Sequence, residues 1–433
     1  MKKSLICPLP WLSLAVRNDG VHRVCCHANV SEGRGVLRDS QNQVQRADEQ
    51  PIAEVRNSES LKEIRRQMLK GEWPAACGRC HREESLGLRS KRIYASEFLD
   101  LPFQKYQDGT AQDGSIPISE WPIEDLDLRF GNKCNLKCRM CGPSDSNAWY
   151  GDFEALQGRA FQPEGNFSWY QDERFWEQLF QQTEKLQHIY LVGGEPLLIK
   201  QHFSFLRRLA DTGRASQVTL EYNSNLTVLP DEVLEIWRSF KEVKVGVSVD
   251  GYGELNNYIR HPSVFKNIEN NLLKLDAAPI HLNAWIATTL SIYNFLDLNE
   301  LLIWKVRMNF SRVGVSKEKP LITPHFLHKP SHLSLKCLPA AIKNRTKELM
   351  PRLRQDFEHR LAEFSLPGPL VSNYLRQWDD IHSSILKFME AEASGSDDFA
   401  RFKTWNQDLD KIRSQTFQSV MSPQYQAAFE GHL

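Results

Sequence analysis

The sequence predicts an α/β protein in which a parallel sheet lies between a small N-terminal module and a helical C-terminal region. From about residue 123, apolar strand patterns alternate with helical patterns, which is typical of βα units around a parallel sheet. The first hundred residues instead contain short strand-like pieces and turn-rich stretches, and the last hundred are charged and mostly helical. We therefore expect three regions, at residues 1–105, 120–335 and 340–433.

Six segments of the middle region have strand character. They are residues 123–131, 188–194, 217–225, 243–250, 281–290 and 308–316. Helical stretches lie between them, such as residues 231–240, where Val233, Ile236 and Trp237 repeat at helical spacing. Such a helix has one apolar face and can cover the sheet.

Composition excludes several kinds of partner. Lys and Arg total 54 and Asp and Glu total 54, so no net charge favours nucleic acid or an acidic membrane surface. No stretch reaches the ~18 apolar residues of a membrane span. Pro8 and Pro10 interrupt the first apolar run, which argues against a secretory signal. We expect a cytoplasmic protein with no nucleic-acid partner and no membrane partner.

Three cysteines stand close together directly after the first strand of the middle region. Cys134, Cys138 and Cys141 have the spacing C-x3-C-x2-C. Three thiolates hold three corners of a 4Fe-4S cluster and leave the fourth iron free to bind another molecule. A structural zinc site needs a fourth ligand, and no Cys or His follows within the next dozen residues. The spacing therefore favours an open iron-sulfur site.

Small and polar residues occupy one face of the following strands near their ends. In residues 243–250 the valines share one face, so period-two alternation places Gly246, Ser248 and Asp250 on the other. Asn223 and Asn225 alternate in the same way with apolar residues. Because ligands of α/β barrels sit at the carboxyl ends of the strands, these side chains are candidates for binding one.

The triad, the Gly-Pro that follows it and the strand ending in Arg129, Phe130 and Gly131 resemble the radical S-adenosylmethionine (SAM) superfamily. Further motifs occur in the order in which that family binds its cofactor. They are Gly193-Gly194-Glu195-Pro196, Asn223-Ser224-Asn225, Ser248-Val249-Asp250-Gly251, Arg260 and Asn294. The resemblance implies a partial (β/α)6 TIM-type barrel.

The resemblance also implies a function and a role for each motif. The cluster at the catalytic triad would cleave SAM reductively to a 5'-deoxyadenosyl radical, with electrons from a donor of flavodoxin or ferredoxin type. Gly193 and Gly194 would approach the methionyl amine, beside Glu195. Arg260 would bind the methionyl carboxylate. Ser248, Asp250 and Asn225 would bind the ribose. The radical would then take a hydrogen atom from a peptide or small natural-product substrate.

A second set of cysteines lies in the N-terminal module. Cys7, Cys25, Cys77 and Cys80 can close a cluster or a zinc ion completely. The set resembles the twitch module, a shortened SPASM domain that holds an auxiliary 4Fe-4S cluster, although here it precedes the barrel. Cys26 stands next to Cys25 and is an alternative ligand. Zinc remains an alternative to iron.

Two rival functions remain open, and two other patterns carry little weight. The rivals are a non-catalytic zinc or iron-sulfur scaffold and a sugar or alcohol dehydrogenase of the same superfamily.

Gly251-Tyr252-Gly253 lacks the third glycine of a dinucleotide loop. His325, His328, His332 and Cys337 match no closed zinc spacing, so we expect ordinary surface or core residues there.

Overall fold

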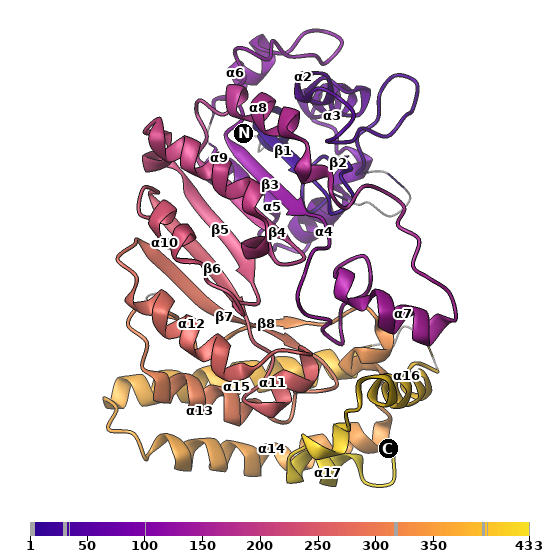
Figure 1. Cartoon of the computed structure of the whole chain (residues 1–433), viewed down its shortest axis with the longest axis vertical. Helices are drawn as coiled ribbons and strands as arrows, with labels where there is room; N and C mark the ends of the chain where they lie inside the picture. Colours follow the sequence, from indigo (N-terminus) through magenta and orange to yellow (C-terminus); the bar gives the residue numbers. More distant parts are fainter. Residues whose placement is uncertain are drawn as a thin grey trace. The chain divides into compact units, whose positions relative to one another are not determined.

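The computed structural model describes residues 5–28, 33, 35–99, 101–315, 319–391, 395 and 397–432. Figure 1 labels the elements. The helices are α1 (Leu9–Leu12), α2 (Ile52–Arg56), α3 (Glu59–Leu69), α4 (Gly78–Ser85), α5 (Lys91–Phe98), α6 (Phe103–Asp108), α7 (Tyr150–Gln157), α8 (Glu173–Gln182), α9 (Lys200–Asp211), α10 (Asp231–Trp237), α11 (Glu254–Ile259), α12 (Phe265–Ala277), α13 (Leu298–Met308), α14 (Ala340–Leu361), α15 (Gly368–Glu390), α16 (Asp398–Arg413) and α17 (Pro423–Phe429). None of these described helices is both long and apolar enough to cross a membrane.

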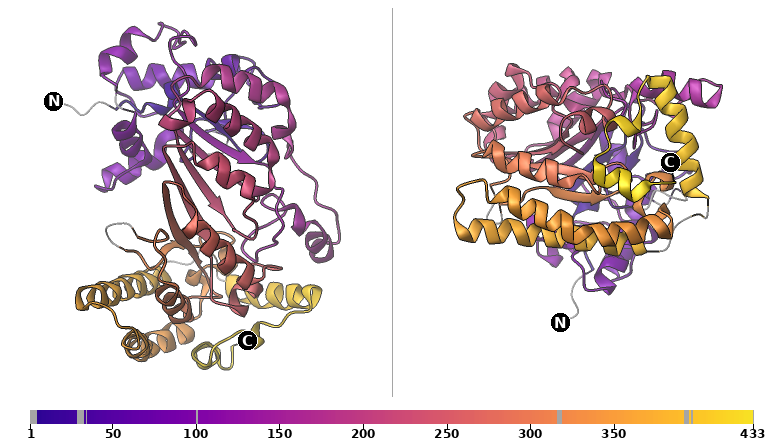
Figure 2. Two further views of the ribbon diagram at one scale, coloured as in Figure 1. Left: turned by 60° about the vertical axis from the view of Figure 1, so that its left-hand side comes forward. Right: turned by 90° about the horizontal axis from the view of Figure 1, so that it is seen from below.

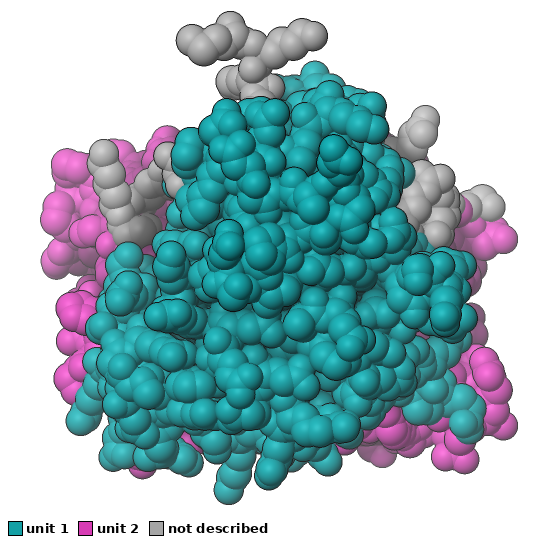
Figure 3. All heavy atoms as spheres, turned by 90° about the horizontal axis from the view of Figure 1, so that it is seen from above, with its two compact units in different colours: residues 1–133, 162–222, 232–243 teal, residues 134–161, 223–231, 244–433 magenta. Residues whose placement is uncertain are grey.

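The chain divides into two compact units, coloured teal and magenta in Figure 3. Unit 1 consists of Met1–Lys133, Gln162–Tyr222 and Glu232–Val243. Unit 2 consists of Cys134–Phe161, Asn223–Asp231 and Lys244–Leu433. The three regions expected from the sequence remain a prediction of domain organisation.

Eight strands form one mostly parallel sheet. They are β1 (Ser13–Val16), β2 (His22–Arg23), β3 (Asp125–Phe130), β4 (His188–Gly193), β5 (Thr219–Ser224), β6 (Glu242–Ser248), β7 (Leu282–Leu290) and β8 (Thr323–Phe326), in the order β2-β1-β3-β4-β5-β6-β7-β8. β2 pairs antiparallel with β1, whereas the β1–β3, β3–β4, β4–β5 and β7–β8 pairings are parallel. Parallel pairing aligns Leu128 with Leu191, and Ile189 with Leu220. The predicted α/β class with a parallel sheet is confirmed.

A short hairpin formed by β1 and β2 lies near the N-terminus. β1 and β2 flank a turn in which Gly20 has a φ of 81°, and the backbone N–H of Arg17 donates to the carbonyl of Val21. β1 also pairs parallel with β3. The N-terminal segment therefore extends the same sheet to which β3 belongs.

Five of the six predicted strands are present, but the sixth is not where the sequence placed it. Among the described residues of 308–316, Val313 makes one isolated bridge, and Ser316 lies outside the described part. The Asp276 carboxylate accepts the backbone N–H groups of Ser311, Arg312 and Val313. These donors are not available to a strand ladder, and β8 takes the edge position instead, pairing with β7.

The core follows the predicted pattern. Val243, Val245 and Val247 of β6 are completely buried. Helix α10 lies within the predicted stretch 231–240 and buries Val233 and Trp237. The ring centroid of Trp237 lies 5.1 Å from that of Tyr222 on β5, so α10 covers this part of the sheet. The alternate, polar positions of the strands remain for other contacts.

The C-terminal region is helical, as predicted. α15 begins at Gly368, directly after Pro367, with a proline in its first turn. Figure 2 shows α14 and α15 as long neighbouring helices, and an ion pair joins Arg354 of α14 to Asp379 of α15. This region belongs entirely to unit 2.

Candidate functional site

The first cysteine set lies on an irregular loop that follows β3. Gly131, with a φ of 51°, starts this loop. A Cβ atom there would lie 1.9 Å from the carbonyl oxygen of Phe167, so only glycine fits. The indole Nε1 of Trp149 donates to the carbonyl of Cys138 over 2.9 Å, and the Ser146 hydroxyl donates to that of Leu136 over 2.5 Å. Side chains that follow the loop in sequence thus fix its backbone.

Donors surround the sulfur atoms of this set. The backbone N–H of Leu136 donates to Cys134 Sγ over 3.5 Å, and Asn225 Nδ2 does so over 3.8 Å. Arg260 Nη1 lies 4.0 Å from Cys138 Sγ. A hydrogen bond from Cys141 and the charge of Arg260 lower the pKa of the Cys138 thiol, despite its burial. This environment favours a thiolate at Cys138, the form in which cysteine binds iron, whereas the hydrogen bond to Cys138 and burial raise the pKa of the Cys141 thiol.

Asp250 positions Arg260. Its carboxylate is completely buried, with one oxygen 2.7 Å from Arg260 Nε and the other accepting the backbone N–H of Thr289 over 2.7 Å. Asn294 Nδ2 donates to the carbonyls of Asp250 and Thr289, each over 2.8 Å. The end of β6 is thereby tied to the end of β7, beside the first cysteine set. Ser248, also predicted, is the last residue of β6 and is half-buried.

The two predicted asparagines after β5 have different surroundings. Asn225 joins Asn135 over 3.1 Å and so reaches the cysteine loop directly. Asn223 lies beneath Gly246, where a Cβ atom would be 2.7 Å from Asn223 Oδ1. A side chain at position 246 would clash with Asn223, so glycine at this position allows the observed conformation of Asn223.

The Gly-Gly-Glu-Pro motif after β4 packs against the residues that lead into the cysteine loop. A Cβ atom on Gly193 would lie 2.7 Å from the backbone nitrogen of Phe130, and one on Gly194 would lie 2.3 Å from the carbonyl oxygen of Lys133. The backbone N–H of Glu195 donates to that Lys133 carbonyl over 2.8 Å. The Glu195 carboxylate is buried and accepts the N–H of Leu197, and Pro196 begins the short 3-10 turn that follows. The two glycines are required by close backbone packing.

The structure brings the four cysteines of the second set together. Cys7, Cys25, Cys77 and Cys80 line one cavity in unit 1, and Cys26 does not line it. Burial raises the pKa of Cys7, Cys25 and Cys77, and the neighbouring thiols of the set raise each further. Cys7 and Cys80 are buried and Cys25 and Cys77 are half-buried. The raised pKa values of Cys7, Cys25 and Cys77 show that thiolates at these positions would repel one another, so a cation bound between them would be needed to stabilise the charged forms. The donor set fits a metal centre.

A mixed group of ligands overlaps this set. The ligand atoms of His27, Cys80 and Glu83 all lie within 4.8 Å of one another, and no other such group of three occurs among the described residues. His27 also lines the cavity of the four cysteines. His325, His328, His332 and Cys337 do not form a group of this kind; Cys337, for example, donates to the carbonyl of His332.

A cavity of about 390 Å³ adjoins the second set in unit 1, and sequence analysis did not predict it. Cys25, Cys26, His27 and Lys91 line it on one side. Polar side chains of the sheet line the other; they are Ser13, Asp125, Asp127, Arg129, His188, Tyr190 and Glu221. Leu9, Cys25, His27 and Lys91 border both cavities, so a ligand here would lie next to the four cysteines.

His188 is held as a cation in this cavity. Burial alone would lower its pKa, but hydrogen bonds to Asp125 over 2.8 Å and to Glu221 over 3.3 Å outweigh that effect and raise the pKa to about 9. Ser13 donates to the other oxygen of Asp125 over 2.7 Å. A chain of hydrogen bonds thus crosses four strands on the cavity wall.

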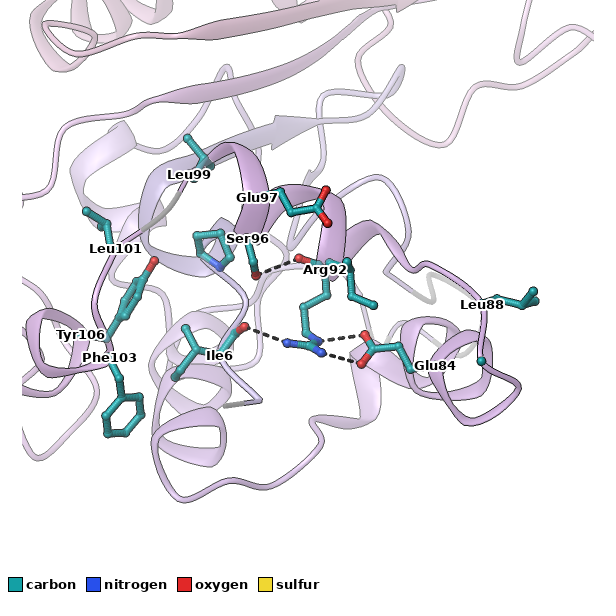
Figure 4. A pocket seen from close by; sticks show the side chains of 13 residues that line it. Ile6, Glu84, Leu88, Arg92, Ser96, Glu97, Leu99, Leu101, Phe103 and Tyr106 are labelled. Atoms are coloured by element: carbon teal, nitrogen blue, oxygen red, sulfur yellow. Dashed lines mark hydrogen bonds and ion pairs between the residues drawn. The ribbon is translucent and has the colours of Figure 1, made fainter. Parts of the chain in front are cut away.

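A larger cavity of about 560 Å³ lies among α4, α5, α6 and the N-terminal segment (Figure 4). Leu88, Leu99, Leu101 and Phe103 contribute apolar surface, and Arg92 bridges Glu84 and the carbonyl of Ile6. This bridge connects α4 and α5 to the residue before Cys7. The cavity contains none of the predicted site residues.

Comparison with known proteins identifies the middle region. Residues 128–300 match the family model of the Radical SAM superfamily. This segment of the chain matches the Radical SAM superfamily. All three cysteines of the first set, the Gly-Gly-Glu-Pro motif and Asp250 fall within it, whereas the second set precedes it. No curated protein matches the chain.

Solved structures with similarity to this chain include anSMEcpe. Native anSMEcpe with bound AdoMet is 17% identical, with 55% of this chain and 61% of that chain covered and a TM-score of 0.37. Native anSMEcpe with bound AdoMet and Cp18Cys peptide is 16% identical over the same shares, with a TM-score of 0.35. The chain thus spans about three-fifths of the length of these structures.

Sequence analysis missed several residues that contact the loop of the first cysteine set. Arg139 and Lys137 of the loop bind side chains from α7 and from the C-terminal region. The one local signal was the presence of two cations inside the cysteine motif. The residues that bind these two cations, Asp152, Asn406 and Asp410, belong to no recognisable sequence motif.

Proposed function

We propose that this chain is a radical SAM enzyme that holds a 4Fe-4S cluster on Cys134, Cys138 and Cys141. The observation that supports this most is that the three thiols share one loop after β3 inside the segment that matches the Radical SAM model. The donors to Cys134 and Cys138 fit thiolates bound to iron. When bound, such a cluster supplies the electron that cleaves SAM to methionine and a 5'-deoxyadenosyl radical.

The chain's own residues would bind and orient SAM. Arg260 offers a guanidinium beside Cys138, which suits the methionyl carboxylate, and Asp250 holds it there. Gly193 and Gly194 expose backbone next to the residues that lead into the cysteine loop, which suits the methionyl amine. Asn225, Ser248 and Asn294 remain candidates for polar contacts with the nucleoside. The two oxygens of Asp250 already have partners, so we assign it the positioning of Arg260.

The cavity of about 390 Å³ is our candidate for the substrate site. Asp127 and Glu221 can accept hydrogen bonds, and Lys91 and Arg129 can donate them. This lining suits a small polar molecule or one to two residues of a peptide better than a hydrocarbon chain. A peptide or polar natural product is therefore the substrate class we favour, and a sugar or alcohol is the alternative.

We assign the second set an auxiliary 4Fe-4S cluster on Cys7, Cys25, Cys77 and Cys80. Four thiolates leave no iron open for SAM, so its role would be electron transfer to or from the substrate. A flavodoxin or ferredoxin would supply low-potential electrons to the enzyme. The alternative is a zinc scaffold, which the nearby ligands His27 and Glu83 favour, since zinc accepts mixed nitrogen, sulfur and oxygen ligands.

The test is anaerobic purification followed by iron analysis and SAM cleavage. We expect a brown protein with about eight irons, from two four-iron clusters. Dithionite and SAM should yield 5'-deoxyadenosine. Colourless protein that contains zinc and forms no 5'-deoxyadenosine would favour the scaffold.

A further inference from the structure

Arg139 lies between two predicted cluster ligands, yet its side chain points into the protein interior. It follows Cys138 directly and is completely buried. Its guanidinium carbon lies 3.6 Å from the ring centroid of Tyr258, and its Nε donates to the Tyr258 carbonyl over 3.2 Å. The backbone N–H of Arg139 donates to the carbonyl of Ile259 over 2.8 Å. A buried cation of this kind needs a compensating charge.

That charge comes from the C-terminal region. Arg139 Nη1 donates to Asn406 Oδ1 over 2.9 Å, Nη2 donates to Gln415 Oε1 over 3.0 Å, and Nη2 forms an ion pair with Asp410. Asn406 and Asp410 are four residues apart on α16 and therefore share one face of that helix. The hydroxyl of Tyr258 also donates to Asp410, over 2.8 Å. α16 thus presents a polar face that binds the guanidinium.

A second connection joins the same two segments. Lys137 Nζ and Arg413 Nε each lie 2.7 Å from the carboxylate of Asp152. The guanidinium of Arg413, the last residue of α16, lies 4.6 Å from the ring centroid of Trp149. The indole of Trp149 in turn donates to the carbonyl of Cys138. Both cations within the cysteine motif are therefore connected to α16.

We propose that α16 and the residues that follow it to Gln415 are a clamp that holds the loop of the first cysteine set in its ligand-binding conformation. Arg139 and Asp410 are its positioning residues. The inference rests on the proposed function, since it assigns the clamp to the loop that would carry the SAM-cleaving cluster. It gives the C-terminal region a role in the chemistry, in addition to packing. All residues involved belong to unit 2.

The reason for a clamp is the irregular structure of the loop. Residues 134–141 form no helix or strand, and their backbone is held only by separate hydrogen bonds, such as those from the N–H groups of Lys137 and Arg139 to the carbonyls of His261 and Ile259. Ligands on such a loop depend on the contacts of neighbouring side chains for their orientation. Arg139 supplies a rigid, planar group with several donors in fixed directions. A lysine has a single ammonium group and could not make the same set of hydrogen bonds.

The test compares Asp410→Asn with Asp379→Asn in the full-length, anaerobically reconstituted protein. The two substitutions make the same chemical change in the helical C-terminal region, but Asp379 pairs with Arg354 near the surface, whereas Asp410 pairs with Arg139 of the loop. One readout is the rate at which a ferrous chelator removes iron. The other is the change in the electron paramagnetic resonance spectrum on addition of SAM, to which only a cluster with an open iron responds.

We expect Asp410→Asn to lose iron about tenfold faster than wild type and to bind SAM about tenfold more weakly, as for other residues that orient metal ligands. Asp379→Asn should match wild type in both. If Asp410→Asn also matches wild type, the clamp is overturned. If wild type itself gives no SAM-dependent spectral change, the proposed function fails, and the clamp fails with it.

A milder variant covers the case in which Asp410→Asn does not fold. Gln415→Leu removes one neutral acceptor of Arg139 and leaves the ion pair in place. Circular dichroism should show a folded protein. Faster iron loss than in Asp379→Asn supports the clamp, and an equal rate overturns it.

Discussion

Arg139 and Asp410 are 271 positions apart in the chain and form a buried ion pair. The arginine stands within the cysteine motif, and the aspartate stands in the last turn of α16. The pair connects the end of the chain to the loop on which the proposed chemistry depends. Loss of the C-terminal helices should therefore affect the first centre as well as stability.

Cys25 and Cys26 should differ in their effect on the second centre. Cys25 lines the cavity of the four cysteines, and Cys26 lines only the neighbouring polar cavity. Cys25→Ala should lose about half of the bound iron, and Cys26→Ala should retain it, by the count of four irons per cluster. Iron and sulfide analysis checks this. If the two variants contained equal amounts of iron, the prediction that Cys25 binds the cluster and Cys26 does not would be wrong.

The same Cys25→Ala variant tests the role of the second centre. With dithionite as the reductant it should still form 5'-deoxyadenosine, because the first centre is unchanged, but substrate turnover should fail. Circular dichroism is the folding control, since the loss of a metal centre can unfold a small module. Full turnover by a folded variant would show the second centre to be structural only.

Gly194→Ala should disturb the close packing of the Gly-Gly-Glu-Pro motif against the backbone of Lys133. The added Cβ would lie 2.3 Å from the carbonyl oxygen of Lys133, a backbone atom that cannot move without shifting its neighbours. We expect a loss of about 1–3 kcal/mol in the free energy of unfolding and slower SAM cleavage. Gly151→Ala is the control, because Gly151 has open space around it. Equal stability of the two variants would contradict this packing argument.

Asp250→Asn should weaken SAM binding and leave the iron content unchanged. The substitution retains the shape of the side chain but removes the charge that holds Arg260 beside Cys138. We expect roughly tenfold weaker binding, comparable to the loss of other residues that orient a ligand-binding group. Equilibrium binding of SAM to the reconstituted protein measures it. Unchanged affinity would mean that Arg260 needs no support from Asp250.

His188 should make stability depend on pH. Its pKa is about 9 in the folded protein, against 6.5 as its ordinary value, so the folded state binds the proton more tightly. The stabilisation is complete below pH 6.5 and is lost as the pH rises through 9. Its size is about 3 kcal/mol by linkage.

The measurement compares the free energy of unfolding of wild type and His188→Gln from pH 6 to pH 10. The difference between the two proteins should fall by about 3 kcal/mol over this range. The comparison with a variant is needed because Lys305, whose pKa burial lowers to about 8, acts in the opposite direction. A difference that does not change with pH would show that His188 is not held as a cation.

The sequence predicted the parts of the fold and site that repeat at short range. Alternating valines located β6, and helical spacing located α10, because burial of one face imposes a local period. The cysteine motif is equally local. The strand predicted at residues 308–316 is wrong because the Asp276 carboxylate takes the N–H groups of Arg312 and Val313. The partnership of Arg139 with Asp410 could not be predicted, since long-range pairs of charged residues have no pattern in a single sequence.

The polar cavity beside the second cysteine set illustrates the same limit. Asp125, His188 and Glu221 come from three different strands, and each looks like an ordinary polar residue of an edge or an end. Only the register of β3, β4 and β5 brings them together. Their chemistry as a group follows from the sheet, not from the spacing of residues in the chain.

The account depends most on the claim that Cys134, Cys138 and Cys141 hold a cluster that cleaves SAM. The most direct measurement is 5'-deoxyadenosine formation under dithionite by wild type, Cys138→Ala and Cys337→Ala. Cys337 is the matched control, because it belongs to neither cysteine set. We expect wild type and Cys337→Ala to form 5'-deoxyadenosine at similar rates and Cys138→Ala to form none, since two thiolates cannot hold the open cluster. Formation at the wild-type rate by Cys138→Ala would contradict the account.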